Sequence, residues 1–95
     1  MDHGDDQLLK LLKALAHPLR LKMVRALADG GERSCGGLGD QLPLSQPAVS
    51  HHLKILADAG LLKVRNEGQH HFVSIDHEAL AKISRLLPAK KRARR

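Results

Sequence analysis

Residues 45–60 constrain the fold more than any other part of the sequence. Val49, Leu53 and Leu56 recur at the i, i+4 and i+7 positions of one helical face, which predicts a helix packed along an apolar stripe. Four polar side chains lie off that stripe: Gln46, Ser50, His51 and Lys54. An amide, a hydroxyl, an imidazole and an ammonium group near a helix N-terminus suit base edges and phosphates in a DNA major groove. The alternative is an ordinary surface helix with a solvated polar face.

Both ends of this helix are marked in the sequence. Ser45 is a good N-cap residue, and its hydroxyl would accept a hydrogen bond from the N–H of Ala48, because Pro47 has no N–H to donate. Gly60 is placed to end the helix in the left-handed conformation. The sequence therefore predicts a helix with a defined start and a defined stop.

The composition indicates one small domain. The chain has 95 residues, one Phe and neither Tyr nor Trp, so its core has to be built from Leu, Ala, Val and Ile. The lack of aromatic side chains disfavours recognition of RNA or of single strands by stacking. A single Cys excludes an intrachain disulfide and fits a reducing compartment. Lys10 and Lys13 interrupt the leucine run, which follows acidic residues, so we expect a cytoplasmic protein with no signal peptide and no membrane partner.

The net charge of +6 is concentrated at the C-terminal end. Residues 89–95 hold five of the sixteen basic residues, and the other eleven face ten acidic ones. We therefore expect a single domain over residues 1–88, followed by a disordered basic tail over residues 89–95. The tail either adds non-specific affinity for phosphates or only improves solubility.

Three helices are predicted before residue 45. The first spans about residues 5–16, and its leucine face is broader than one small core requires. His17 is expected to be a polar hinge residue before Pro18, which starts a second helix that ends near residue 28. A short third helix over about residues 35–41 is rich in glycine, so tertiary packing has to hold it.

After residue 60 the apolar period changes from 3.6 to 2, which predicts a β-hairpin with its turn at residues 66–68. Val64 and His71 are expected on its packed face. The outer positions are basic or polar: Lys63, Arg65, Gln69 and His70. Asp76 is the expected N-cap of a last helix. The apolar stripe of that helix is Leu80, Ile83 and Leu87.

The predicted order is helix, helix, short helix, helix, hairpin, helix. This is a mainly α fold with a small β-hairpin, the winged helix-turn-helix. Four ordered segments resemble the ArsR/SmtB family of bacterial repressors, and the resemblance extends from about residue 8 to residue 87. The segments are Leu-Ala-His-Pro-Leu-Arg-Leu at residues 15–21, the run Leu-Ser-Gln-Pro-Ala-Val-Ser-His-His-Leu-Lys-Ile-Leu at 44–56, Ala-Gly-Leu-Leu at 59–62 and the wing at 65–72.

The resemblance implies a homodimer whose first and last helices form the interface, and the small size of the chain agrees with this. The expected interface side chains are Leu8, Leu9, Leu12, Leu80, Ile83 and Leu87. The resemblance also implies base and phosphate contacts by the helix at residues 46–54, where Pro47 stands in place of the Ser of many relatives. With the helix start and the wing included, the expected DNA-binding residues are Ser45, Gln46, Pro47, Ser50, His51, Lys54, Lys63, Arg65, Gln69 and His70.

Many members of the family are released from DNA by a metal, but neither of two family metal sites is matched in this sequence. One site uses two thiols separated by one residue, where this chain has Ser-Cys-Gly at residues 34–36. The other uses Asp and His pairs on the last helix, and only its first ligand is matched, by Asp76. Three other residues occupy the remaining ligand positions: Glu78, Ala89 and Arg92. We therefore expect no cofactor, and a metal effector would have to use a site other than these two.

Cys35 has two interpretations. A thiol near a helix N-terminus can have a lowered pKa and act as a redox sensor, whereas a lone Cys is more often a small packed residue. The pairs at residues 51–52 and 70–71 cannot chelate a metal through adjacent imidazoles, because neighbouring side chains point apart. A metal site that combines His3 or the acidic N-terminal residues of one subunit with Cys35 of the other is left open.

Two functions fit these patterns. The first is a dimeric repressor on the bacterial nucleoid, which binds an inverted-repeat operator in double-stranded DNA with half-sites about 10 bp apart. The sequence leaves open whether an effector releases it from DNA. The second is a winged-helix adaptor or antirepressor that uses the same face on a protein partner. An enzyme is not expected, because the sequence has no carboxylate pair, nucleophile–base pair or phosphate loop at usable spacing.

Overall fold

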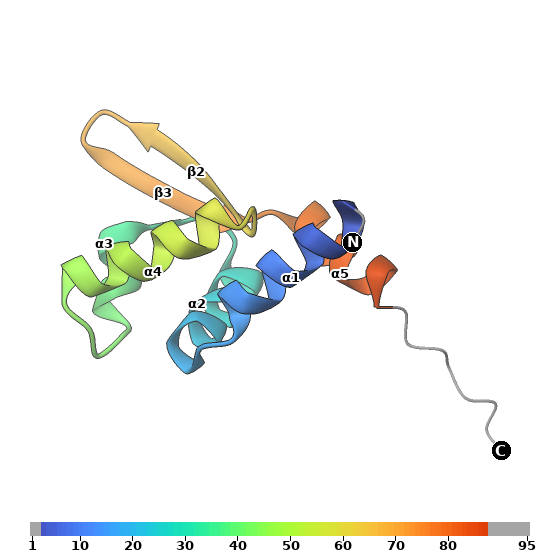
Figure 1. Ribbon diagram of the computed structural model, residues 1–95. Helices are drawn as coiled ribbons and strands as arrows, with labels where there is room; N and C mark the ends of the chain where they lie inside the picture. The colour runs from blue at the N-terminus through green and yellow to red at the C-terminus, as the bar shows by residue number, and fades with distance from the viewer. Residues whose placement is uncertain (1–2, 88–95) are drawn as a thin grey trace, which may run out of the picture.

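The computed structural model describes residues 3–87 of the chain. Its elements are α1 (His3–Leu15), α2 (Pro18–Gly30), β1 (Arg33–Ser34), α3 (Cys35–Asp40), α4 (Gln46–Asp58), β2 (Leu62–Glu67), β3 (His70–Ile75) and α5 (His77–Leu86). In Figure 1, α1 and α5 lie side by side at one end of the molecule, and the β2–β3 hairpin stands out at the other end above α4. The predicted winged helix-turn-helix is confirmed. None of the helices in this part of the chain is long and apolar enough to cross a membrane.

The start and the stop of α4 are those that its sequence predicts. The hydroxyl of Ser45 accepts a hydrogen bond from the N–H of Ala48 at 3.3 Å. Gly60 follows the C-terminal end with a φ of +92°, a conformation that favours glycine. The apolar stripe is fully or almost fully buried at its three positions: Val49, Leu53 and Leu56.

Side-chain and glycine caps also set the ends of α2 and α5. The Nδ1 atom of His17 accepts from the N–H of Leu19 at 3.1 Å, so the expected hinge residue is the N-cap of α2. α2 runs to Gly30, two residues beyond its predicted end, and stops at Gly31, whose φ is +73°. Asp76 caps α5 as predicted, because its carboxylate accepts from the N–H groups of residues 78 and 79.

α3 is a helix of glycine-rich sequence that tertiary packing holds in place. Ser34 caps it by accepting from the N–H of Gly37 at 3.0 Å. Gly39 is buried against α4, where an added Cβ would collide with the side-chain amide of Gln46 and lie 3.5 Å from Val49. The low helix propensity of glycine is therefore offset by the close approach that it allows between α3 and α4.

The predicted hairpin is present, but its turn is shorter than expected. Glu67 pairs with His70, so the turn consists of Gly68 and Gln69, and Gly68 has a φ of +62°. The expected turn at residues 66–68 is wrong because β2 continues to Glu67. A third strand was not expected: β1 pairs antiparallel with β3 and gives a sheet with the order β1-β3-β2. Two residues are too few for a period-2 pattern to reveal a strand.

The hydrophobic core lies between the helices and the base of the sheet. As the composition indicates, it is almost entirely aliphatic, with Met23 as the exception. Its fully buried larger side chains are Leu11, Met23, Leu27, Leu38, Val49, Leu56, Leu61 and Val73. The core therefore fixes α4 through one face only and leaves the opposite face to solvent.

Candidate nucleic-acid interface

The polar face of α4 is open to solvent in the isolated chain. The predicted contact residues of this helix are all exposed: Gln46, Pro47, Ser50, His51 and Lys54. The predicted contact residues outside the helix are also exposed: Ser45, Lys63, Arg65, Gln69 and His70. Lys54 forms a weak ion pair with Asp58 at 4.0 Å, and both side chains are mostly exposed. Apart from Ser45, whose hydroxyl caps α4, and Arg65, which other side chains hold, these residues are therefore available to an external partner.

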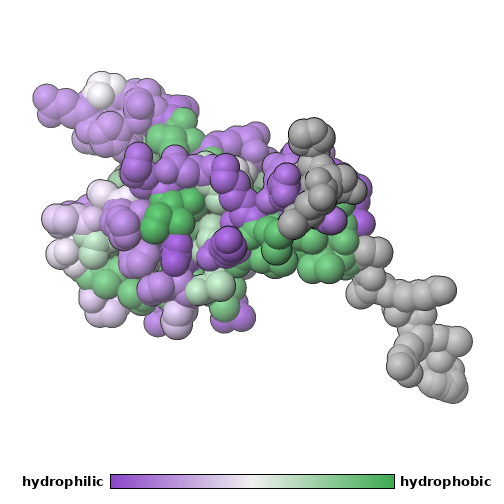
Figure 2. Space-filling model, viewed as in Figure 1, coloured by the Kyte–Doolittle hydropathy of each residue, from purple (hydrophilic) through white to green (hydrophobic). Residues whose placement is uncertain are grey.

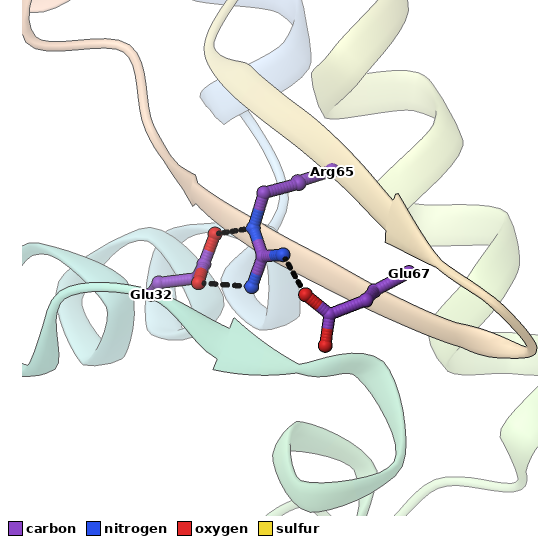
Figure 3. Close-up of polar contacts among 3 residues, drawn as sticks. All are labelled: Glu32, Arg65 and Glu67. Atoms are coloured by element: carbon purple, nitrogen blue, oxygen red, sulfur yellow. Dashed lines mark hydrogen bonds and ion pairs between the residues drawn. The ribbon is translucent and has the colours of Figure 1, made fainter.

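Arg65 on the wing is held by two carboxylates, as Figure 3 shows. Its Nε donates to Glu32 at 3.0 Å and a terminal nitrogen donates to the other Glu32 oxygen at 2.8 Å, a bidentate pair. The second terminal nitrogen donates to Glu67 at 2.9 Å, and the guanidinium carbon lies 4.5 Å from the centre of the Phe72 ring. Arg65 therefore links the hairpin to the turn between α2 and β1.

This pairing changes the electrostatics of the wing. The hydrogen bonds from Arg65 lower the pKa of Glu32, and the hydrogen bonds to Glu32 and Glu67 raise the pKa of Arg65. A guanidinium has five N–H groups, and these bonds use three of them. Arg65 keeps two free N–H donors, but the carboxylates of Glu32 and Glu67 offset its positive charge. The sequence did not indicate this pairing. Glu32 lies 33 residues from Arg65 in a loop without a motif, so no local signal could have identified it.

Two hairpin residues differ from their expected positions. His71 was expected to pack, but it is exposed and its Nδ1 lies 2.6 Å from the side-chain oxygen of Asn66. Val64 was also expected on the packed face, yet 54% of it is exposed. The hairpin extends beyond the core, so only its base, at Leu62, Val73 and Ile75, is buried. Alternation identifies the two faces of a strand but not the length over which one face is covered.

His52 lies between two other histidine rings, those of His17 and His51. The ring centroid of His52 is 4.7 Å from that of His17 and 5.6 Å from that of His51. Burial, and after it the charges of His17, Arg20 and His51, lowers the pKa of His52. Its Nδ1 is buried with no hydrogen-bond partner among the described residues. His52 is therefore held in its neutral form more strongly than an exposed histidine.

We expect this lowered pKa to make folding stability dependent on pH. Protons bind His52 more readily in the unfolded chain, whose histidine pKa is about 6.5, so stability is lost as the pH falls below that value and is recovered above it. Thermal denaturation followed by circular dichroism between pH 7.5 and pH 5.5 should show a smaller loss of Tm for His52→Gln than for the wild type. The exposed His77→Gln serves as the control. An equal loss in all three proteins would contradict this account.

Exposed leucines gather over α1 and α5. Figure 2 shows hydrophobic side chains on the part of the surface formed by these helices. Leu9 and Leu12 of α1 are 43% and 37% exposed, and Leu86 and Leu87 at the end of α5 are 38% and 54% exposed. Leu86 was not among the expected interface residues. Leu8 was, but it is buried within one chain, whereas Leu80 and Ile83 are half-buried.

Cys35 and the histidines do not form a converging ligand set in the part of the chain that is described. Among the side chains that the structure describes, no three of His, Cys, Asp and Glu approach one another as a metal site requires. Burial raises the pKa of the Cys35 thiol, which keeps it protonated and weakly nucleophilic and supports the interpretation as a packed residue. The side chain of His3 and the tail at residues 89–95 lie outside the described residues.

The sequence and the fold match known regulators. A family model described as a helix-turn-helix domain matches residues 15–65. The biofilm growth-associated repressor of Agrobacterium fabrum is 38% identical over 83% of this chain and 67% of its own length. The arsenical resistance operon repressor of Staphylococcus xylosus is 36% identical over 85% of this chain and 77% of its own length.

A solved structure shares the same architecture. It is the homodimeric winged helix-turn-helix DNA-binding domain of an ArsR-family regulator candidate from Mycobacterium bovis. The two chains are 30% identical, superpose with a TM-score of 0.74, and match over 86% of this chain and 75% of the other.

Proposed function

Because the chain belongs to the ArsR family of helix-turn-helix transcriptional regulators, we propose that two copies of it form a repressor that binds an inverted-repeat operator. Family membership makes the protein a DNA-binding regulator and not an enzyme. Beyond family membership, we propose that the protein is a homodimer, that its operator is an inverted repeat and that it acts in the cytoplasm at the bacterial nucleoid. We also propose the residues that contact the DNA.

The observation that carries this proposal is the separation of the two faces of α4. Val49, Leu53 and Leu56 anchor one face in the core, while the polar side chains of the other face remain exposed. A rigid helix with short polar side chains near its N-terminus fits the major groove, where His51 would contact base edges. Lys54, with only a weak ion pair, would contact a phosphate.

A second copy would cover the exposed leucines of α1 and α5. Burial of such side chains is the main driving force for association, and a chain of 95 residues gains stability from it. A twofold dimer presents two α4 helices to one side of the duplex, with half-sites about 10 bp apart. The hairpins would then lie along the flanking backbone.

Selection of bound fragments from the genome of the source organism tests this function directly. We expect enrichment of an inverted repeat, and hydroxyl-radical footprints in two protected segments about one helical turn apart. Effectors are then tested by repeating the selection with metals and oxidants. A folded dimer that enriches no fragment at low salt would contradict the proposal and favour the adaptor function.

Arg65 provides a test of the wing. Arg65→Ala should weaken cognate and random DNA by the same factor and reduce the slope of log affinity against log salt by about 1, because a phosphate contact carries no sequence information. Glu32→Gln is the matched control, since it removes one competing carboxylate and should strengthen binding to both DNAs. An unchanged salt slope in Arg65→Ala would mean that Arg65 only braces the hairpin.

A further inference from the structure

A cleft lies between α1 and α4, away from the polar face of the recognition helix. Its volume is about 280 Å³. Its apolar part is formed by Ala14 of α1, by Ile55 of α4 and by Ala59, which follows α4 directly, and all three are buried or half-buried. A wider outer region of about 670 Å³ shares some of these residues and extends to Asp6 and Leu9. The cleft therefore adjoins both the recognition helix and the exposed leucine face.

Three cationic side chains line the inner cleft, against one carboxylate. Lys10 and Lys13 come from α1, Arg20 comes from α2, and the carboxylate is that of Asp58. Within residues 3–87, none of these three cations forms an ion pair. Asp58 forms a weak ion pair with Lys54 outside this cationic group, at 4.0 Å. The inner cleft therefore has an excess of positive charge over an apolar floor.

Arg20 lines the cleft and carries an unsatisfied hydrogen-bond donor. Its Nε is buried and has no hydrogen-bond partner among the described residues. A buried donor without a partner is destabilising, and such groups in proteins are usually satisfied by a ligand, an ion or water. An anion in the cleft would accept hydrogen bonds from the terminal N–H groups of the guanidinium, since the Nε itself is closed to solvent.

From the charge, the apolar floor and the unpaired guanidinium, we propose that this cleft binds a small organic anion and that the bound anion changes the affinity for DNA. The ligand has an apolar body that packs on Ile55 and Ala59 and one acidic group that faces Lys10, Lys13 and Arg20. This regulatory role depends on the proposed function, because α4 forms one wall of the cleft and is also the helix that would enter the groove.

Dimer formation leaves Lys10 accessible, whereas Lys13 lies one turn from Leu9, at the edge of the leucine face. Lys10 and Leu12 are two residues apart in α1 and therefore point about 160° apart around the helix. Leu12 belongs to the exposed leucine face, so a second copy that covers this leucine faces away from Lys10. The anion would bind next to the interface rather than within it. In the cleft it would contact both α1 and α4.

The binding test uses 8-anilinonaphthalene-1-sulfonate, an aromatic probe with one sulfonate group, and the full chain. We expect saturable binding of one probe per subunit, and much weaker binding of N-phenyl-1-naphthylamine, which has the same ring system without the sulfonate. Amide chemical shifts should change at Ala14, Ile55 and Ala59. Shift changes confined to Leu9, Leu12 and the end of α5 would overturn the proposal, since they would show probe adsorbed to the leucine face.

Paired lysine variants locate the charge requirement. Lys10→Gln combined with Lys13→Gln should weaken sulfonate binding by about tenfold or more, whereas Lys22→Gln combined with Arg25→Gln removes the same charge elsewhere and should have little effect. All four side chains are exposed, so both double variants should fold like the wild type. Equal weakening in the two double variants would mean general electrostatic attraction and would overturn the site.

To test the regulatory role, operator affinity is measured with and without a saturating concentration of the sulfonate probe. We expect the affinity of the wild type for the operator to change at least threefold and that of the Lys10→Gln, Lys13→Gln variant to stay constant. An operator affinity that does not respond to the bound probe would overturn the regulatory role. A chain that binds the probe in the cleft but no DNA in its absence would contradict the proposed function and leave the anion site standing.

Discussion

Replacing Leu12 with lysine is expected to separate the subunits and to weaken operator binding by at least about 100-fold. Leu12 is 37% exposed and lies in the leucine face of α1 and α5 that we assign to the dimer interface. An ammonium group placed in an apolar interface loses its hydration without gaining a partner. A monomer binds a single half-site and loses the gain in effective concentration that a linked second site provides, which is typically 10² to 10⁴.

Sedimentation velocity and operator binding measure the two effects of Leu12→Lys. Leu21→Lys is the matched control, because Leu21 is also 37% exposed but lies on α2, outside the leucine face. Both variants should keep the helical circular dichroism spectrum of the wild type. A Leu12→Lys variant that remains dimeric, or a Leu21→Lys variant that dissociates to the same extent, would show that the interface lies elsewhere.

Replacing His51 with alanine is expected to cost about 1–3 kcal/mol of binding free energy at the cognate operator, roughly 5- to 150-fold in affinity. His51 is exposed on α4 and points away from the buried stripe, so its removal should not disturb the core. A side chain that reads a base edge contributes to cognate binding only. The affinity for random DNA should therefore remain close to that of the wild type, and the base preference at one position should relax.

Gel-shift titrations of His51→Ala with operator and random duplexes provide the comparison. His77→Ala removes another exposed histidine, at the start of α5 and outside the proposed contact surface, and should change neither affinity. Equal losses on operator and random DNA would contradict base recognition by His51 and would indicate a contact to phosphate instead.

The elements that could be predicted are those whose causes lie close together in the chain. The cap at Ser45, the buried stripe of α4, the glycine stop at Gly60 and the cap at Asp76 depend on residues within two turns of one another. A Ser hydroxyl three residues before a free N–H predicts a helix N-cap in any fold, and an apolar period of 3.6 predicts a helix packed on one face. These features were sufficient to position the polar face of α4.

The surroundings of the candidate site depend on long-range contacts. The carboxylates that hold Arg65, the exposure of His71 and Val64, and the unpaired Nε of Arg20 follow from how far the hairpin extends and how α2 packs on α4. The cleft beside α1 is likewise formed by residues from three helices. None of these features leaves a periodic or local pattern.

The amino-acid order alone determined the succession of helices and strands, the apolar stripe of α4 and the resemblance to a family of regulators, because each arises from propensity and periodicity over a few residues. Tertiary structure alone decided which charges are offset, which leucines stay uncovered and where the cationic cleft opens. Charge pairing and solvent exposure depend on distances across the folded chain, such as that between Glu32 and Arg65, and folding sets those distances through the packing of the whole core.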